Sequence, residues 1–184
     1  AREKVHFSFA ALRVLPGSGR DTARARRETV IDRGPARMLS VAGGKLTTYR
    51  RIALDVLGQL RPELGLHRLD RHPWPLPGAG GLETTELPLE LPPSVRSNLL
   101  HLYGSLAAEV VAPAAEDPSL LEPLADGAPE LAAQALYAAT HEWARSTEDV
   151  LRRRTLLTLG GHANAQVEAR VSELLGSPKL PAEP

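Results

Sequence analysis

The stretch Met38–Arg50 joins an apolar run, two glycines and several polar side chains in a pattern that suits a ligand. A helix opening at Lys45 presents unpaired N–H groups and about half a positive charge, which favour an anion or a polarised oxygen. The glycines Gly43 and Gly44 let the backbone approach a flat or bulky ligand closely, and Thr47 and Thr48 add hydroxyl donors. An ordinary strand–helix turn with a glycine stop is the alternative.

Other groupings lack a partner that their chemistry requires. Gly17-Ser18-Gly19 follows an apolar run, but Thr22 stands where a dinucleotide fingerprint has its third glycine. His141 and Glu142 open like a zinc-protease motif, but Arg145 occupies the position of the second His. We therefore predict neither a Rossmann turn nor a metal site.

The run Arg152–Arg154 is a second charged feature without obvious chemistry. Three adjacent Arg residues on a helix point in three directions. This run predicts a solvated face with one intramolecular ion pair, to Glu148 or Asp149.

The elements that must position these residues form two groups. The first 60 residues predict three strands and one helix, Val5–Leu15, Glu28–Asp32, Met38–Ala42 and Lys45–Leu60. The helix has an apolar stripe at three- and four-residue steps, made of Leu46, Tyr49, Ile52, Ala53, Val56, Leu57 and Leu60. Residues 61–93 are rich in Pro and Gly and predict a linker.

Residues 94–177 predict a small helical bundle, and residues 178–184 a loose tail. Its helices are expected to begin at Ser94, Pro118, Pro129, Thr147 and Ala163. The third carries an apolar face from Leu131 to Trp143, and the fourth is expected to run from a capping box at Ser146 to about Leu159.

Composition limits the class of protein. Hydrophobic residues make up 42% of the 184 residues and aromatic residues only 4%, which favours a Leu- and Ala-rich helical core. The expected fold class is α+β, mostly α. Cysteine is absent, and no apolar run is long enough to span a bilayer.

Charge is unevenly distributed along the chain. Lys plus Arg and Asp plus Glu both number 22, which argues against nucleic acid as the main partner. However, residues 1–72 carry 15 basic and 7 acidic residues, and residues 73–184 carry 7 and 15. The basic part can hold an anionic ligand, or the two regions can neutralise one another.

Two segments closely resemble motifs of FAD-dependent glycerol-3-phosphate dehydrogenases and their oxidase relatives. Ala42–Arg50 (AGGKLTTYR) resembles the family's flavin-side motif, and Glu142–Thr155 (EWARSTEDVLRRRT) the signature of its C-terminal helical domain. Phe9–Arg13 and Arg27-Glu28 are weaker matches that occur in the family's order. Val14 and Leu15 precede Pro16 where the family usually has Arg-Pro, and Thr147 replaces a usual Leu.

The resemblance implies a role for each matched position. Arg13 and Arg27 would bind the phosphate of glycerol 3-phosphate, because guanidinium groups stay charged and bond phosphate oxygens in pairs. Lys45 would reach the substrate as well as the cofactor, which the resemblance implies to be FAD. The residues expected against the flavin ring are Gly43, Gly44, Lys45, Leu46 and Thr47. The Glu142–Thr155 segment would be structural, with buried ion pairs.

The family's N-terminal FAD-binding half has no counterpart in the sequence, and no residue is a candidate for the catalytic base. We therefore expect the C-terminal part of a dehydrogenase that oxidises glycerol 3-phosphate to dihydroxyacetone phosphate, inactive by itself. Residues 1–60 would be the remnant of the flavin and substrate domain. The alternative is a non-catalytic remnant that acts as a helical interaction or assembly module.

The same resemblance sets the expected partners and location. Electrons would pass from the flavin to a membrane quinone, or to oxygen in the oxidase branch. The missing N-terminal domain and glycerol 3-phosphate are the other expected partners, and a homodimer stays open. The expected location is cytoplasmic, peripheral on the inner face of the cell membrane.

Overall fold

A computed structural model describes Val5 and residues 8–12, 28–88 and 90–176. The chain divides between Trp74 and Pro75 into two compact units. This division lies inside the predicted linker 61–93. We refer to residues 28–74 as the hairpin–helix unit and to residues 75–176 as the helical unit.

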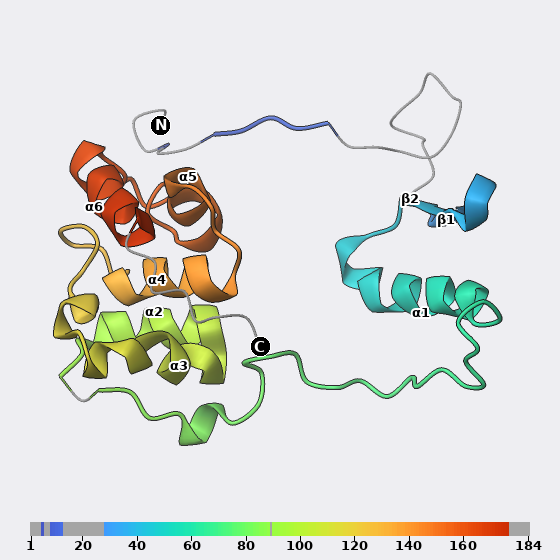
Figure 1. Cartoon of the computed structure of the whole chain (residues 1–184), viewed down its shortest axis with the longest axis horizontal. Coiled ribbons are helices and arrows are strands. Elements are labelled where there is room, and N and C mark those ends of the chain that lie inside the picture. The colour runs from blue at the N-terminus through green and yellow to red at the C-terminus, as the bar shows by residue number, and fades with distance from the viewer. Residues whose placement is uncertain (1–4, 6–7, 13–27, 89, 177–184) are drawn as a thin grey trace. The chain divides into compact units, whose positions relative to one another are not determined.

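The hairpin–helix unit begins with two antiparallel strands, β1 (Val30–Arg33) and β2 (Leu39–Ala42) (Figure 1). Val30 pairs with Ala42 and Arg33 with Leu39, so the two strands are in full register. A 3-10 turn, Pro35–Arg37, connects them. The two later strands of the sequence prediction are thus confirmed within a residue or two. Val5 and residues 8–12 form no regular element, so the predicted strand Val5–Leu15 is wrong there.

The helix of this unit starts later than predicted. A 3-10 turn, Leu46–Thr48, precedes α1 (Tyr49–Leu60), so regular α-helix begins four residues after Lys45. Its apolar stripe is not buried: Leu46 is 89% exposed and Tyr49 is also exposed. No described residue before Leu87 is buried, and a two-stranded sheet is marginal by itself. The hairpin–helix unit therefore has no core of its own.

The helical unit contains five α-helices among its described residues, with short 3-10 and π segments between them (Figure 1). The α-helices are α2 (Pro93–Tyr103), α3 (Ala107–Val111), α4 (Ala132–His141), α5 (Thr147–Asp149) and α6 (Ala165–Gly176). The 3-10 segments are Leu82–Thr84, Gly104–Leu106, Ala112–Ala115 and Pro118–Leu121, and the π segment is Val150–Arg154. With the two-stranded sheet, this confirms the mostly α class of α+β fold.

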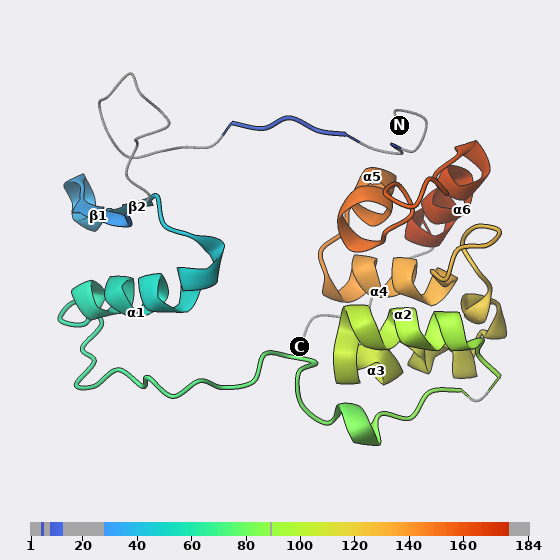
Figure 2. The same cartoon turned by 180° about the vertical axis from the view of Figure 1, so that it is seen from behind.

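Helix α4 lies in the middle of the helical unit, with α2 and α3 on one side and α5 and α6 on the other (Figures 1 and 2). Its small residues make this position possible, since Ala132, Ala135 and Ala138 are almost completely buried. Leu99 of α2, Val110 of α3 and the other buried residues around it form one apolar core. Leu87 and Leu91 of the predicted linker also belong to that core.

Helix boundaries in this unit differ from the sequence prediction at several points. Ser94 is not an N-cap, because α2 begins at Pro93. Helix α4 begins at Ala132 rather than Pro129 and ends before Trp143, which is 80% exposed with φ of 61°. The helical run that starts at Thr147 ends at Arg154, not near Leu159. The helix start at Pro118 and the capping box at Ser146 are confirmed, and Asp117 is found to cap the Pro118 segment by accepting from the Ser119 N–H.

Candidate functional site

The loop between β2 and the 3-10 turn Leu46–Thr48 brings the predicted flavin-side residues together on consecutive positions. Gly43 and Gly44 both adopt the left-handed conformation, with φ of 76° and 79°. Residues with a Cβ rarely adopt this conformation, so two successive glycines are the sequence feature that allows the turn.

Gly44 also has a packing role. A Cβ at this position would lie 2.6 Å from Ile52 Cδ1 and 2.9 Å from Thr29 Oγ1. The close approach joins the loop to the first turns of α1. Gly44 is therefore needed for the loop's own structure whether or not a ligand contacts it.

The remaining residues of the loop face solvent. Gly43, Lys45, Leu46 and Thr47 are all exposed. Within the described part of the chain, no hydrogen bond or ion pair involves the side chains of Lys45 or Thr47. An ammonium group, an apolar side chain and a hydroxyl group thus lie next to one another and can contact a flat, anionic ligand.

Thr48 differs from Thr47 because its hydroxyl is used inside the loop. Thr48 Oγ1 donates to the Lys45 carbonyl at 2.9 Å and accepts from the Lys45 N–H at 3.3 Å. These bonds hold Lys45 at the start of the 3-10 turn. The prediction that both threonines offer free hydroxyl donors is wrong for Thr48.

Arginines around this loop have local partners or are outside the described residues. Arg13 and Arg27, the predicted phosphate ligands, both lie outside the residues that the structure describes. Arg50 donates to the Arg71 carbonyl, and Arg51 is paired with Asp55 at 3.1 Å. The structure thus places Gly43–Thr47 on one loop. The phosphate contacts of Arg13 and Arg27 stay predictions.

The segment Glu142–Thr155 is held by a capping box and by ion pairs along the helix. Ser146 Oγ accepts from the Asp149 N–H at 3.2 Å, and Asp149 Oδ2 accepts from the N–H groups of Arg145 and Ser146. These contacts lower the pKa of Asp149, with the Arg145 N–H as the largest cause. The capping box of Ser146 and Asp149 therefore favours the ionised form of the Asp149 carboxylate.

The three arginines of this segment all form intramolecular ion pairs, to Glu148, Asp149 and Glu142, whereas the sequence predicted one pair. Arg152 contacts Glu148 and Arg153 contacts Asp149, both at 2.8 Å, and Arg154 donates to the Glu142 carbonyl. The pairs are half-exposed, so the expectation of buried ion pairs is wrong for them. Their contribution is the small one of surface pairs.

Burial changes the acidity of Glu142 and Tyr103 in the helical unit. Partial burial raises the pKa of Glu142, while Arg154 opposes the shift. Burial raises the pKa of Tyr103 to about 12, although the Gln134 amide lies 3.4 Å from its hydroxyl. Gln134 also accepts from the Leu131 N–H at 2.8 Å, so it joins α2 to the start of α4. These are structural contacts within the core.

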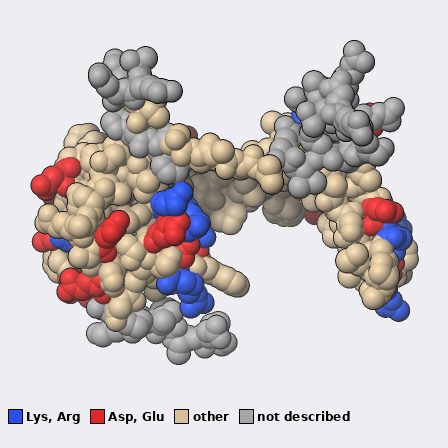
Figure 3. Space-filling view, turned by 90° about the horizontal axis from the view of Figure 1, so that it is seen from above, with Lys and Arg blue, Asp and Glu red and all other residues tan. Residues whose placement is uncertain are grey.

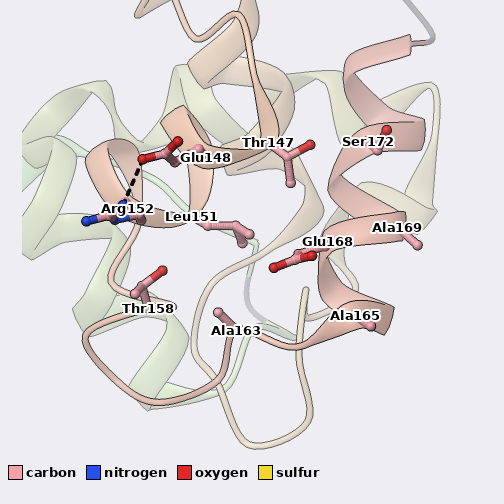
Figure 4. Close-up of a pocket in the computed structure, with 10 residues that line it drawn as sticks. All are labelled: Thr147, Glu148, Leu151, Arg152, Thr158, Ala163, Ala165, Glu168, Ala169 and Ser172. Carbon is pink, nitrogen blue, oxygen red and sulfur yellow. Dashed lines mark hydrogen bonds and ion pairs between the residues drawn. The ribbon is translucent and has the colours of Figure 1, made fainter. Parts of the chain in front are cut away.

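An open groove of about 840 Å³ lies between α6 and the segment from Thr147 to Thr158 (Figure 4). Leu151 lies on one side of it and Glu168 on the other, and the Glu148–Arg152 ion pair is at its edge (Figure 4). This groove could not be predicted from the sequence, because small residues on α6 give no signal besides helical spacing. Its wall residues are Thr147, Glu148, Leu151, Arg152, Thr158, Ala163, Ala165, Glu168, Ala169 and Ser172.

The described ranges contain neither a metal-binding cluster nor a membrane-spanning helix. No group of three or more His, Asp or Glu residues is arranged to hold a metal ion there. No helix in those ranges combines the length and apolarity that crossing a membrane requires.

Comparison with known proteins decides the family. The model of the family described as the C-terminal domain of alpha-glycerophosphate oxidase matches residues 47–179, well over half of the chain. The chain belongs to this family. The family match starts at Thr47, the last residue of the Gly43–Thr47 loop, and includes α1 and the whole described helical unit.

Curated relatives of this family member are named glycerol-3-phosphate dehydrogenases. Glycerol-3-phosphate dehydrogenase 2 of Mycobacterium tuberculosis is 35% identical over 162 residues, covering 82% of this chain and 28% of the relative. Glycerol-3-phosphate dehydrogenase 1 of the same organism is 36% identical over 186 residues, covering 91% and 33%. The Synechocystis enzyme of that name is 29% identical over 177 residues, covering 86% and 31%. The chain thus spans about a third of the length of these relatives.

Proposed function

We propose that this chain forms the C-terminal part of an FAD-dependent glycerol-3-phosphate dehydrogenase. The family match over residues 47–179 is the observation that carries the proposal. The names of the relatives supply the reaction class, an oxidation of glycerol 3-phosphate. Dihydroxyacetone phosphate is the product proposed for this chain's full enzyme.

The Gly43–Thr47 loop fits the cofactor proposed for it. Gly43, Lys45, Leu46 and Thr47 are exposed, and Leu46 offers an apolar side chain that a flat ring can cover. Lys45 adds a positive charge that favours the anionic, reduced ring. Gly44 fits indirectly, because its packing against Ile52 holds the loop in place. When bound, FAD accepts a hydride from the substrate carbon that bears the hydroxyl group.

The basic residues of the chain would bind and orient the substrate. Arg13 and Arg27 are proposed to bond the phosphate oxygens, and Lys45 to reach the substrate from the loop. A fixed phosphate brings the reacting carbon to one position, which is how binding contacts accelerate such a reaction. The hydroxyl proton passes to a base that this sequence does not contain.

The proposal also includes the electron acceptor, the location of the enzyme and the behaviour of the chain by itself. A membrane quinone would be the electron acceptor of the full enzyme, and its location would be the cytoplasmic face of the cell membrane. The chain by itself neither retains FAD nor turns over, because the hairpin–helix unit has no buried residue among those described.

A chimera tests the proposal. The chain replaces the matched C-terminal region of glycerol-3-phosphate dehydrogenase 1 from Mycobacterium tuberculosis, and the parent enzyme is the control. We expect the purified chimera to retain FAD and to reduce a dye with glycerol 3-phosphate but not with glycerol. A chimera that unfolds cooperatively and retains FAD, yet does not respond to glycerol 3-phosphate, would contradict the proposal.

Substitution at Arg27 of the chimera separates substrate binding from folding. We expect Arg27→Ala to raise the KM for glycerol 3-phosphate by roughly tenfold or more, since a charge-assisted phosphate contact is lost. Arg37→Ala, a change of the same type at an exposed turn of the hairpin, is the control. Equal increases of KM in the Arg27→Ala and Arg37→Ala variants would contradict a phosphate contact by Arg27.

The separate core of the helical unit supports a second candidate, a non-catalytic interaction or assembly module. All buried residues in the described ranges lie between Leu87 and Val171. A chain that folds through this unit alone, and whose chimera is inactive although folded, would favour the module over the dehydrogenase.

A further inference from the structure

A second groove, of about 600 Å³, lies in the helical unit between α3, the 3-10 segments that follow it, α4 and the end of α6. Val110, Leu120 and Tyr137 are buried at this groove, and Leu136 and Leu174 are partly buried beside them. The complete lining is Glu109, Val110, Pro113, Glu116, Asp117, Leu120, Leu136, Tyr137, Thr140, His141 and Leu174. Its volume is in the usual range of binding clefts.

The charged side chains of this groove are almost entirely acidic. Glu109, Glu116 and Asp117 line it, and no Lys or Arg does. His141 also lines the groove, with its Nε2 3.5 Å from Glu109 Oε1 and its ring stacked on Tyr137. The groove therefore combines apolar walls with a negative potential.

This charge agrees with that of the whole helical unit. Residues 75–176 contain 14 Asp and Glu residues against six Arg and no Lys. Figure 3 shows the basic side chains of this unit gathered beside acidic ones, with other acidic side chains standing apart from them. A field of this sign steers cationic partners toward the unit.

The carboxylates of the groove follow a regular spacing. Residues 107–111 are α-helical, residues 112–115 continue as a 3-10 helix and Glu116 keeps a helical conformation, and Glu109, Pro113 and Glu116 all line the groove. Seven residues correspond to about 10–14 Å along the axis at the rises of α- and 3-10 helices. Cations seven residues apart on a partner helix have nearly the same separation, about 10.5 Å.

We propose that this groove docks a basic amphipathic helix of a partner polypeptide. Leu-type side chains of the partner fill the apolar part, and its Lys or Arg residues pair with Glu109 and Glu116. A helix that docks in a groove presents anchors at i, i+3, i+4 and i+7, so cations seven residues apart on the partner can face Glu109 and Glu116 while apolar residues between them face the groove. A small amine meets only one of the two carboxylates, so a polypeptide is the better match. The inference does not depend on the redox function proposed above.

Titration of the full chain with a labelled peptide tests this proposal. The probe is a helical peptide of about four turns with Arg residues seven apart and Leu residues between them. We expect saturable binding at micromolar concentration that weakens with added salt, because exposed charges are screened. The same peptide with Glu in place of Arg should not bind.

Paired variants then locate the binding surface. We expect Glu109→Gln/Glu116→Gln to weaken binding by roughly tenfold. The fold should tolerate it, since the Glu109–His141 pair is half-exposed. Glu83→Gln/Glu86→Gln changes the net charge by the same amount at exposed residues outside the groove and should leave binding unchanged.

Several results would overturn the proposal. Equal loss of affinity in the two double variants would mean attraction to net charge alone. Binding of the acidic peptide, or no saturable binding of the basic one, would show that the groove does not select a partner by charge. A dimer of the chain that Glu109→Gln/Glu116→Gln dissociates would assign the groove to a second copy instead.

Discussion

Trp143 is the residue whose backbone conformation is least expected for its type. It follows the C-cap residue Glu142 with φ of 61°, a position where helices usually place glycine. The N–H of Ala144 bonds back to the Ala138 carbonyl at 2.9 Å, and Arg154 donates to the Glu142 carbonyl. Contacts on both sides thus hold a tryptophan in a conformation that is costly for residues with a Cβ.

Glycine at this position should stabilise the helical unit. The left-handed conformation costs a non-glycine residue roughly 1–2 kcal/mol, and the exposed indole loses few contacts when removed. After subtraction of the backbone entropy of glycine, we expect Trp143→Gly to raise the free energy of unfolding by about 0.5–1 kcal/mol. Urea unfolding measures it. Trp143→Ala, which keeps the strain, serves as the control, and a Gly variant less stable than the Ala variant contradicts the explanation.

Asp149 makes stability depend on pH at the acidic end. Its pKa in the folded chain lies below the ordinary value of 3.8, because N–H groups of Arg145 and Ser146 favour the carboxylate. A lowered pKa stabilises the fold above the unfolded value, and this contribution disappears as the pH falls below it. We expect the wild type to lose more stability than Asp149→Asn between about pH 5 and pH 3.

Thermal unfolding across that range provides the comparison. Asp126→Asn, at an exposed carboxylate for which the structure gives no hydrogen bond among described residues, is the matched control and should follow the wild type. The explanation fails when Asp149→Asn and Asp126→Asn have the same pH dependence.

At the scale of elements, the packing of α2 against α4 depends on one side of α2. Leu99 is completely buried, whereas Leu102, three residues later on the same helix, is 37% exposed. Leu99 and Leu102 lie three residues apart, a spacing that predicts one apolar face and ranks the two equally. Only the tertiary packing of the core distinguishes them, because it covers Leu99 and leaves Leu102 partly exposed.

Truncation of these two leucines should therefore have different consequences. We expect Leu99→Ala to lower the free energy of unfolding by about 2–5 kcal/mol, because it leaves a cavity in the core. Leu102→Ala should lie within about 1 kcal/mol of the wild type. Chemical denaturation measures both. Comparable losses at the two positions would contradict burial as the cause of the difference between them.

Some elements followed from local sequence and others did not. Pro118 and the capping residue Ser146 marked their helix starts correctly, since both signals depend on neighbours in sequence. The start of α4 was misplaced, and the Leu124 N–H bonds to the Glu130 carbonyl just before it. The end of the Thr147 helical run was misplaced as well, and there the Thr155 hydroxyl donates to the Val150 carbonyl. The exposure of Leu46 was equally unpredictable, since periodicity shows an apolar face but not whether anything covers it.

Candidate site residues likewise divide into those that local sequence predicted and those that it did not. Gly43–Thr47 were identified from a strand, a glycine pair and a helix in sequence, and the structure keeps them on one loop. The acidic groove at Glu109 and Glu116 was not predicted, since its apolar walls come from α4 and α6, far away in sequence.

For the whole molecule, the two units should differ strongly in local stability. The helical unit holds every buried residue of the described ranges, while the hairpin–helix unit relies on hydrogen bonds that solvent can reach. Amide exchange reports such differences, because exposed elements open at low free energy.

Hydrogen exchange by mass spectrometry should separate the units. We expect amides of α2, α4 and α6 to be protected until global unfolding, and those of β1, β2 and α1 to exchange orders of magnitude faster. In the chimera with the N-terminal region of a relative, protection of α1 should rise. Equal protection of α1 and α4 in the chain alone would show that the hairpin–helix unit is stable without further cover.

Both tryptophans of the chain are already in water, since Trp74 is 74% and Trp143 80% exposed. Native indole emission is therefore red-shifted from the start and changes little when the chain is denatured. The same property makes it a sensitive optical signal for the opposite event. Any molecule that covers Trp143 or Trp74 should shift that emission to the blue without an added dye.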